Sequence, residues 1–207
     1  MKWIVTSIIS IACAVLAFVY LDHPVAEYCK YEMNYELKEF MKVWTHLALA
    51  DAYFLILLLF FVSYGVRHSR LNSSSKLKRM LPYAQFALAA LLFNGIIINI
   101  LKFVFGRQRP TLAANYTHDN FTWFNFDWQF HSMPSGHTQV AFTLAMLAFY
   151  IFPKWNRPLV FGIAISLGLS RVFTTAHFVS DTLIGALIAI LGTKFLYETV
   201  FKKRIHP

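Results

Sequence analysis

Apolar residues are gathered in long runs along this chain, and charged residues are concentrated in the short segments between the runs. Each run is close to the ~20 residues that a helix needs to cross the hydrocarbon core of a bilayer, or somewhat shorter. The pattern predicts an all-α fold, a six-transmembrane-helix bundle that forms a single domain over residues 1–207. The six runs cover approximately residues 3–21, 47–64, 82–105, 138–152, 159–176 and 182–201.

The composition supports a membrane class. Hydrophobic residues make up 57% of the chain and charged residues 14%, and the mean hydropathy is +0.51. A soluble domain of this length could not bury so much apolar surface. The net charge is +9, but much of it lies in short segments between apolar runs. No basic soluble domain is left over that would bind nucleic acid.

The loops predict the orientation of the bundle. One set of segments holds eleven basic residues and no acidic ones, whereas the acidic stretch 22–39 falls in the opposite set. The positive-inside rule then places both termini in the cytoplasm, and a bacterial inner membrane is expected. The first run is longer than the apolar core of a signal peptide and is predicted to be an anchor. The basic residues are Lys2, Arg67, Arg70, Lys76, Lys78, Arg79, Lys154, Arg157, Lys202, Lys203 and Arg204.

The segment 27–42 alternates tyrosines and glutamates at helical spacing. It is predicted to form a short helix on the outer surface, with an ordinary connecting loop as the alternative.

The stretch 170–181 places polar side chains inside one of the most apolar parts of the chain. His177 and Asp181 are four residues apart, so on a helix they share a face, and the carboxylate can hold one imidazole nitrogen. An imidazole held in this way is a nucleophile or a base. Arg171 adds a planar cation that suits phosphate, although a structural ion pair with Asp181 is an alternative.

Two earlier motifs reach the same side of the predicted bundle. Lys102 lies at the end of the third run and Arg109 precedes a proline, while Ser135, Gly136 and His137 open the fourth run. The free amides and the positive dipole of a helix N-terminus bind anions. The topology rests on other loops, so this convergence is an independent indication of one site. Lys102 alone could instead be a lysine whose ammonium extends to the membrane surface.

These residue types predict phosphoryl transfer. Three cations and a helix N-terminus match the oxygens of a phosphate and the charge that builds during its transfer. His177 is predicted to attack phosphorus and form a phosphohistidine. His137 is predicted to protonate the leaving oxygen and then to deprotonate the water that clears the intermediate. The outer segments lack the several carboxylates of a magnesium site, so no metal or other cofactor is expected.

The motifs resemble the three signatures of the type 2 phosphatidic acid phosphatase superfamily. The matching residues are Lys102-x6-Arg109-Pro110, Pro134-Ser135-Gly136-His137 and Ser170-Arg171-x5-His177-x3-Asp181. The resemblance covers residues 102–181 and implies a six-helix fold with its site at the periplasmic membrane interface. It implies phosphate binding by Lys102, Arg109, Ser135, Gly136 and Arg171, and catalysis by His177 as nucleophile, Asp181 as its orienting partner and His137 as general acid.

The sequence therefore predicts a membrane lipid phosphatase that acts on a phosphorylated envelope lipid. Lipid A, undecaprenyl pyrophosphate, phosphatidylglycerophosphate and phosphatidic acid are the candidate substrates. Two alternatives stay open, namely a phosphotransferase that passes the phosphate from His177 to a lipid acceptor, and a non-catalytic lipid-binding membrane subunit. The expected partners are the lipid substrate and the bilayer.

Some residues have no settled role at this stage. The aromatic residues of the outer loop 111–133 are predicted both to form a rim that receives a lipid and to pack the loop on the bundle. Arg107 is a candidate for contact with the lipid head group. Asp51 is a candidate for a bond to Thr45 or to a neighbouring helix.

Asn94 and Asn99 lie within the third run and are predicted to form interhelical hydrogen bonds. A zinc site is disfavoured, because the spacing of its candidate ligands fits no zinc pattern. Those candidates are His118, Asp119, Asp127 and His131.

Overall fold

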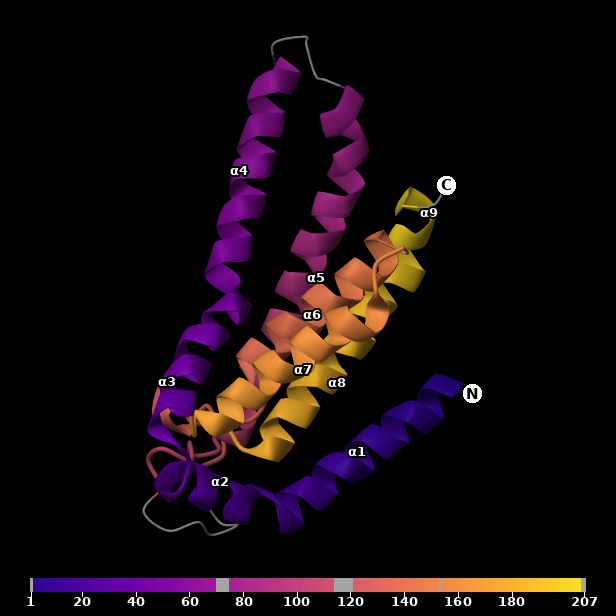
Figure 1. Ribbon diagram of the computed structural model, residues 1–207. Helices are drawn as coiled ribbons and strands as arrows, with labels where there is room; N and C mark the ends of the chain where they lie inside the picture. The colour runs from indigo at the N-terminus through magenta and orange to yellow at the C-terminus, as the bar shows by residue number, and fades with distance from the viewer. Residues whose placement is uncertain (1, 70–74, 114–120, 153, 206–207) are drawn as a thin grey trace.

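Six long helices alternate in direction along the bundle (Figure 1). The computed structural model describes residues 2–69, 75–113, 121–152 and 154–205, with side chains over 5–66, 76–113, 121–152 and 154–205. Each long helix follows one of the six predicted apolar runs. The helices are α1 (Lys2–Tyr20), α4 (Ala50–Ser69), α5 (Ser75–Phe105), α6 (Gly136–Ile151), α7 (Arg157–Phe173) and α8 (Val179–Leu196).

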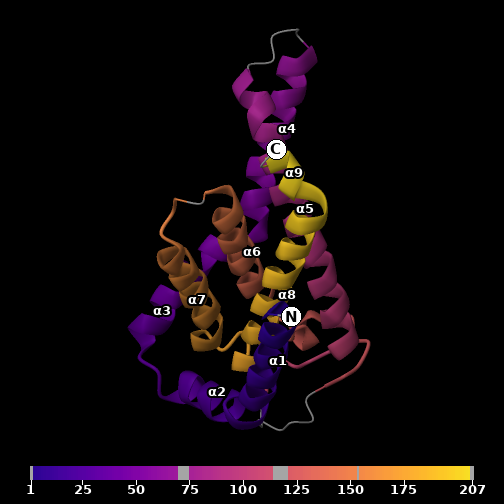
Figure 2. The ribbon, with the colours of Figure 1, turned by 90° about the vertical axis from the view of Figure 1, so that its right-hand side faces the viewer.

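Two short helices, α2 (Asp22–Tyr31) and α3 (Tyr35–Trp44), connect α1 to α4 at one end of the bundle (Figures 1 and 2). The helix predicted over 27–42 is divided in two, because the Asn34 side chain accepts a hydrogen bond from the Leu37 amide and starts a new helix. The remaining elements are the 3-10 helices Thr45–Ala48 and Trp128–Phe130, the π-helix Tyr197–Phe201 and α9 (Lys202–Ile205).

The helices are those of a membrane protein. Among the described residues, three stretches are long and apolar enough to cross a bilayer, namely Tyr35–Val66, Lys76–Phe105 and Val179–Ile205. The pair Val5–Tyr20 and Asp22–Tyr31, bent by 57°, qualifies when taken as one span, whereas Gly136–Ile151 is shorter. The all-helical fold is confirmed, while the number of six spans and the side that the site faces stay predictions.

A polar contact ties α5, α6 and α8 together in the core. Asn94 is fully buried, and its Nδ2 donates to Thr143 Oγ1 at 3.0 Å and to Thr193 Oγ1 at 2.9 Å. The interhelical role predicted for Asn94 is confirmed. Asn99 is different, because its Nδ2 donates to the Gly95 carbonyl of its own helix.

Glycine permits the closest approach of α8 to α6. A Cβ atom added at Gly185 would lie 2.5 Å from the Ser135 carbonyl oxygen. Because no other residue type leaves this space, α8 can bring Asp181 against the start of α6.

Candidate active site

The proposed nucleophile, His177, lies in the turn between α7 and α8 and is 2% exposed. Its Nδ1 is 2.7 Å from the Ser132 carbonyl oxygen. A carbonyl only accepts, so Nδ1 carries the hydrogen of a neutral ring, and the lone pair is on Nε2. The geometry therefore orients one imidazole nitrogen and leaves the other available for chemistry.

Asp181 acts on His177 largely through Ser132. Its Oδ2 is 3.8 Å from His177 Nδ1, which is within ion-pair range but too long for the direct hydrogen bond that the spacing predicted. Oδ2 instead accepts from Ser132 Oγ at 2.6 Å and from the Phe178 amide at 2.9 Å. Sequence reasoning missed Ser132, because no motif singles it out and its contacts are made across the bundle.

Burial lowers the pKa of His177 to about 3. The nearby Asp181 carboxylate opposes this shift, and the positive charges of Lys102 and Arg171 reinforce it. The imidazole is therefore neutral near pH 7, as a nucleophile must be.

Two guanidinium groups come from different elements. Arg109, in the segment after α5, donates from Nε to the Trp128 carbonyl at 3.2 Å and lies 5.6 Å from the centre of the Trp128 ring. Burial lowers the pKa of Arg109, and Asp181 opposes that shift. Arg171, in the last turn of α7, donates from Nη1 to Thr45 Oγ1 at 3.3 Å. Its buried Nε has no partner among the described residues, so a donor is available for an anion.

The start of α6 is built as the sequence predicted. Ser135 is the N-cap residue, and its Oγ accepts from the Thr138 amide, while its own amide donates to the Asp181 carbonyl at 3.0 Å. A Cβ atom added at Gly136 would lie 3.8 Å from Lys102 Nζ. The Lys102 ammonium therefore sits beside the helix N-terminus, where an anion would contact both.

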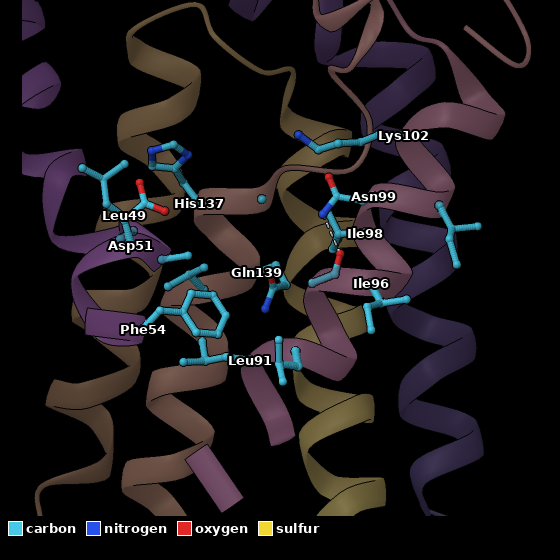
Figure 3. Close-up of a pocket in the computed structure, with 17 residues that line it drawn as sticks. Leu49, Asp51, Phe54, Leu91, Ile96, Ile98, Asn99, Lys102, His137 and Gln139 are labelled. Atoms are coloured by element: carbon cyan, nitrogen blue, oxygen red, sulfur yellow. Dashed lines mark hydrogen bonds between the residues drawn. The ribbon is translucent and has the colours of Figure 1, made fainter. Parts of the chain in front are cut away.

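A cavity of about 620 Å³ begins at this end of α6, and apolar side chains line most of its wall. Lys102 and His137 lie at one end of it, and Phe54 and Leu91 lie further in (Figure 3). Asp51 also lines this cavity, whereas Thr45 is bound to Arg171, so the bond suggested between Asp51 and Thr45 is not formed.

The two histidines share their charged neighbours. Lys102 and Arg171 act electrostatically on both His137 and His177, and Arg109 also acts on His137. The structure therefore brings together every residue that the motifs predicted, at the end of the bundle where α2 and the turn between α7 and α8 lie (Figure 1).

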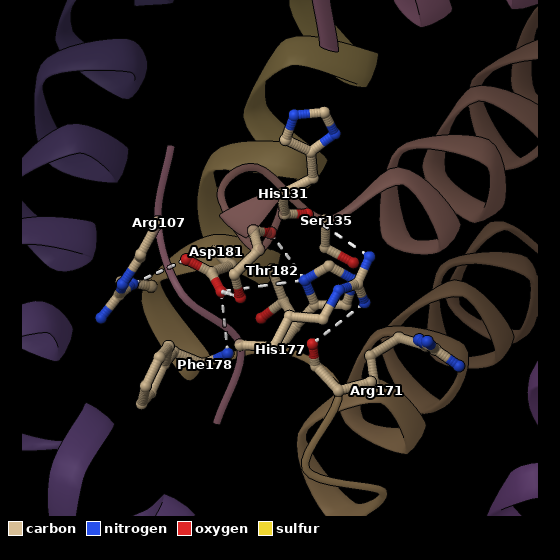
Figure 4. A network of polar contacts seen from close by, with 12 residues as sticks. Arg107, His131, Ser135, Arg171, His177, Phe178, Asp181 and Thr182 are labelled. Carbon is tan, nitrogen blue, oxygen red and sulfur yellow. Dashed lines mark hydrogen bonds and ion pairs between the residues drawn. The ribbon is translucent and has the colours of Figure 1, made fainter. Parts of the chain in front are cut away.

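Arg107 does not face the lipid, and its suggested contact with a head group is wrong. Arg107 is 2% exposed, and its side chain bonds to Asp22 at 2.8 Å and to Asp181 at 2.6 Å. Asp181 lies between Arg107 and His177 (Figure 4). Asp22 was also missed, although a carboxylate at the end of an apolar run is a signal for a buried partner.

The aromatic rings in the described part of the loop 111–133 are divided between exposed and packed positions, so the predicted packing role is confirmed and the predicted lipid-receiving rim stays a prediction. Trp123, Phe124, Phe126 and Trp128 are 60–85% exposed, which suits a rim at a membrane interface. Phe121 packs on the Phe18 ring at 6.0 Å.

Two of the four candidate zinc ligands, Asp127 and His131, belong to the described residues. His118 and Asp119 lie outside the described residues. No group of three or more His, Cys, Asp or Glu side chains suited to a metal occurs within the described ranges.

Comparison with known proteins identifies a family and several relatives. The PAP2 superfamily model matches residues 83–205. A lipid A 1-phosphatase of Rhizobium etli is 29% identical over 192 residues, which cover 89% of this chain and 79% of that protein. A lipid A 1-phosphatase of Porphyromonas gingivalis is 35% identical over 109 residues, which cover 51% of this chain and 21% of that protein.

Two solved structures share the fold. Aquifex aeolicus LpxE has a TM-score of 0.59 at 20% identity, with 84% of this chain and 93% of that chain covered. The PAP2-type phosphatidylglycerolphosphate phosphatase of Bacillus subtilis has a TM-score of 0.59 at 18% identity, with 93% and 96% covered.

Proposed function

This chain belongs to the PAP2 superfamily and is a membrane lipid phosphatase, and we propose that it hydrolyses a phosphorylated envelope lipid through a phosphohistidine at His177. The observation that carries the mechanism is the buried His177 ring, whose Nδ1 is held by the Ser132 carbonyl while Lys102 and Arg171 lie nearby. A neutral imidazole with a free Nε2 beside several cations suits attack on a phosphate.

The mechanism has two steps. In the first, His177 Nε2 bonds to phosphorus, the bond from phosphorus to the leaving oxygen breaks, and His137 gives that oxygen a proton. In the second, His137 takes a proton from water, the water oxygen bonds to phosphorus, and the bond from phosphorus to nitrogen breaks. Inorganic phosphate leaves, and both histidines return to their starting states.

The phosphate is proposed to lie between the cations and the start of α6. Arg171 Nε is a buried donor without a partner among the described residues, and Lys102 stands beside the first turn of α6. Arg109, the Ser135 hydroxyl and the Gly136 amide complete the set of phosphate-binding groups. Their charges favour the transition state, in which negative charge builds on the oxygens.

The cavity between α4, α5 and α6 suits the apolar part of the substrate. It begins at Lys102 and His137 and continues along Phe54, Leu91 and Ile96 (Figure 3). If an acyl chain of the lipid occupied this space, the phosphate of the lipid would lie near Lys102 and His137.

Lipid A phosphorylated at its 1-position is the substrate proposed first, because relatives from Rhizobium etli and Porphyromonas gingivalis are lipid A 1-phosphatases. The positive-inside rule supports a site on the periplasmic face of the inner membrane with cytoplasmic termini.

The test is phosphate release by the purified protein from four lipids in detergent. The lipids are lipid A, undecaprenyl pyrophosphate, phosphatidylglycerophosphate and phosphatidic acid. His177→Ala should abolish release without loss of folding. His131→Ala is the matched control, because the His131 ring points away from His177 (Figure 4) and bonds to the Asn125 carbonyl instead. Full release by folded His177→Ala would refute the mechanism.

Labelled phosphate separates the alternatives. Label in inorganic phosphate supports hydrolysis, whereas label in a second lipid identifies a phosphotransferase. A wild-type protein that binds these lipids but cleaves none of them would be a non-catalytic subunit.

A further inference from the structure

A buried chain of charges connects the first part of the protein to the catalytic carboxylate. Arg107 Nη2 is 2.8 Å from Asp22 Oδ2, and Arg107 Nη1 is 2.6 Å from Asp181 Oδ1. Asp22, Arg107 and Asp181 are each at most 2% exposed. We call these three residues the charge triad. Asp22 lies at the start of α2, outside residues 83–205 that the family model matches.

Asp22 is also anchored to α8. Its Oδ1 accepts from the Ser180 amide at 2.9 Å, and its Oδ2 accepts from Ser180 Oγ. Ser180 Oγ in turn accepts from Arg107 Nη1 at 2.8 Å. Because Ser180 directly precedes Asp181, any change at Asp22 is transmitted to the first turn of α8.

The surroundings of the charge triad make its net charge important. The Arg107 guanidinium lies 4.0 Å from the centre of the Phe178 ring, 5.0 Å from that of Phe18 and 5.5 Å from that of Phe121. These rings exclude water, so charges inside them interact strongly.

The count of charges shows what Asp22 adds. Arg107 and Asp181 alone would form a neutral pair, and the carboxylate would lose most of its effect on His177. With Asp22 the charge triad carries one net negative charge. That charge opposes the cations Lys102 and Arg171, which act on the His177 ring, and it stabilises the positive charge that develops on the ring during attack.

We propose that Asp22 and Arg107 are positioning residues of the reaction. Arg107 fixes Asp181, so that Asp181 holds Ser132 and thereby His177. Asp22 restores the negative charge that Arg107 would otherwise cancel. The inference rests on the proposed function, and it makes the segment joining α1 and α2 part of the catalytic apparatus rather than only a membrane anchor.

The test compares Asp22→Asn with Glu27→Gln, an exposed carboxylate on the same helix. Asparagine keeps the shape of Asp22 and an acceptor for the Ser180 amide, but it removes the charge. The expected result is a fall in kcat of about 10- to 100-fold, a KM within about twofold of wild type, and slower formation of the phosphohistidine. Glu27→Gln should match wild type. A folded Asp22→Asn protein with wild-type kcat would overturn the proposal.

A double-variant cycle separates charge from packing. In an Arg107→Gln background, Asp22 no longer offsets a cation. Asp22→Asn should therefore leave the kcat of Arg107→Gln unchanged or raise it. If Asp22 acted only by accepting hydrogen bonds from Ser180, Asp22→Asn would lower kcat by the same factor in the wild-type and Arg107→Gln backgrounds. That result would contradict the proposal.

Two further outcomes are decisive. If Asp22→Asn does not fold in detergent, Asp22→Glu replaces it, since it keeps the charge and shifts its position. Because the negative charge is retained, the proposal then predicts a kcat close to that of wild type at unchanged KM, and a loss of kcat as large as that expected for Asp22→Asn would refute it. If the wild type itself releases no phosphate from any of the four lipids, the proposed function fails and this inference fails with it.

Discussion

Replacing Gly185 by alanine adds one methyl group at the closest contact between α8 and α6. The new Cβ atom would lie 2.5 Å from the Ser135 carbonyl oxygen and 3.4 Å from the Ser135 amide nitrogen. Ordinary contacts begin near 3.4 Å, so the two helices must separate locally by about 0.9 Å. Ser135 caps α6 and is bonded to the Asp181 carbonyl. The displacement therefore moves the turn that is proposed to bind phosphate relative to His177.

The expected cost follows from the size of this displacement. A shift of about 1 Å in a catalytic constellation can lower the rate by ~10²-fold. Gly185→Ala should accordingly reduce kcat/KM by about 10- to 100-fold, which corresponds to ~1.4–2.7 kcal/mol of lost transition-state stabilisation. Overpacking should also lower the free energy of unfolding by about 1–3 kcal/mol.

The assay is phosphate release in detergent, combined with an unfolding titration. Gly162→Ala in α7 is the matched control, because an added Cβ meets nothing within 4 Å. It should keep wild-type kcat/KM and be at least as stable as wild type, because alanine favours a helix interior over glycine. A folded Gly185→Ala protein with unchanged kcat/KM would show that the contact between α6 and α8 does not position the site.

Three further predictions concern the core, the nucleophile and the transition state. Asn94→Ala removes two buried interhelical hydrogen bonds and should lower the free energy of unfolding by about 1–2 kcal/mol with unchanged kcat/KM; equal stability in an unfolding titration would contradict this. Burial lowers the pKa of His177 from 6.5 to about 3, so the folded state binds fewer protons than the unfolded state between these values. Stability should therefore fall as pH is lowered from ~6.5 towards 3, by ~2 kcal/mol at pH 5, and His177→Ala should lack this part of the loss in titrations at pH 7 and pH 5. Vanadate, which adopts the five-coordinate geometry of phosphoryl transfer, should inhibit competitively with lipid; wild-type initial rates at saturating vanadate would count against the phosphate site.

The linear pattern of residues was sufficient to predict the helical class and the lipid phosphatase family, and it is the basis of the proposed chemistry. Apolar runs of membrane length predict helices wherever they occur, because the backbone must satisfy its own hydrogen bonds in lipid. His177, Arg171 and the Ser135–His137 turn predict a phosphate site, because their residue types have few other uses inside apolar helices.

Tertiary structure alone decided how that site is held. The His177 ring is oriented by the Ser132 carbonyl, which lies 45 residues away in the chain, and Asp181 is paired with Arg107 rather than bonded directly to the ring. Asp22 belongs to the same cluster, although it lies 159 residues before Asp181 in the chain. Contacts of this kind depend on how close the helices approach and on which polar groups they bury together. Neither quantity is encoded in the spacing of residues along a single helix.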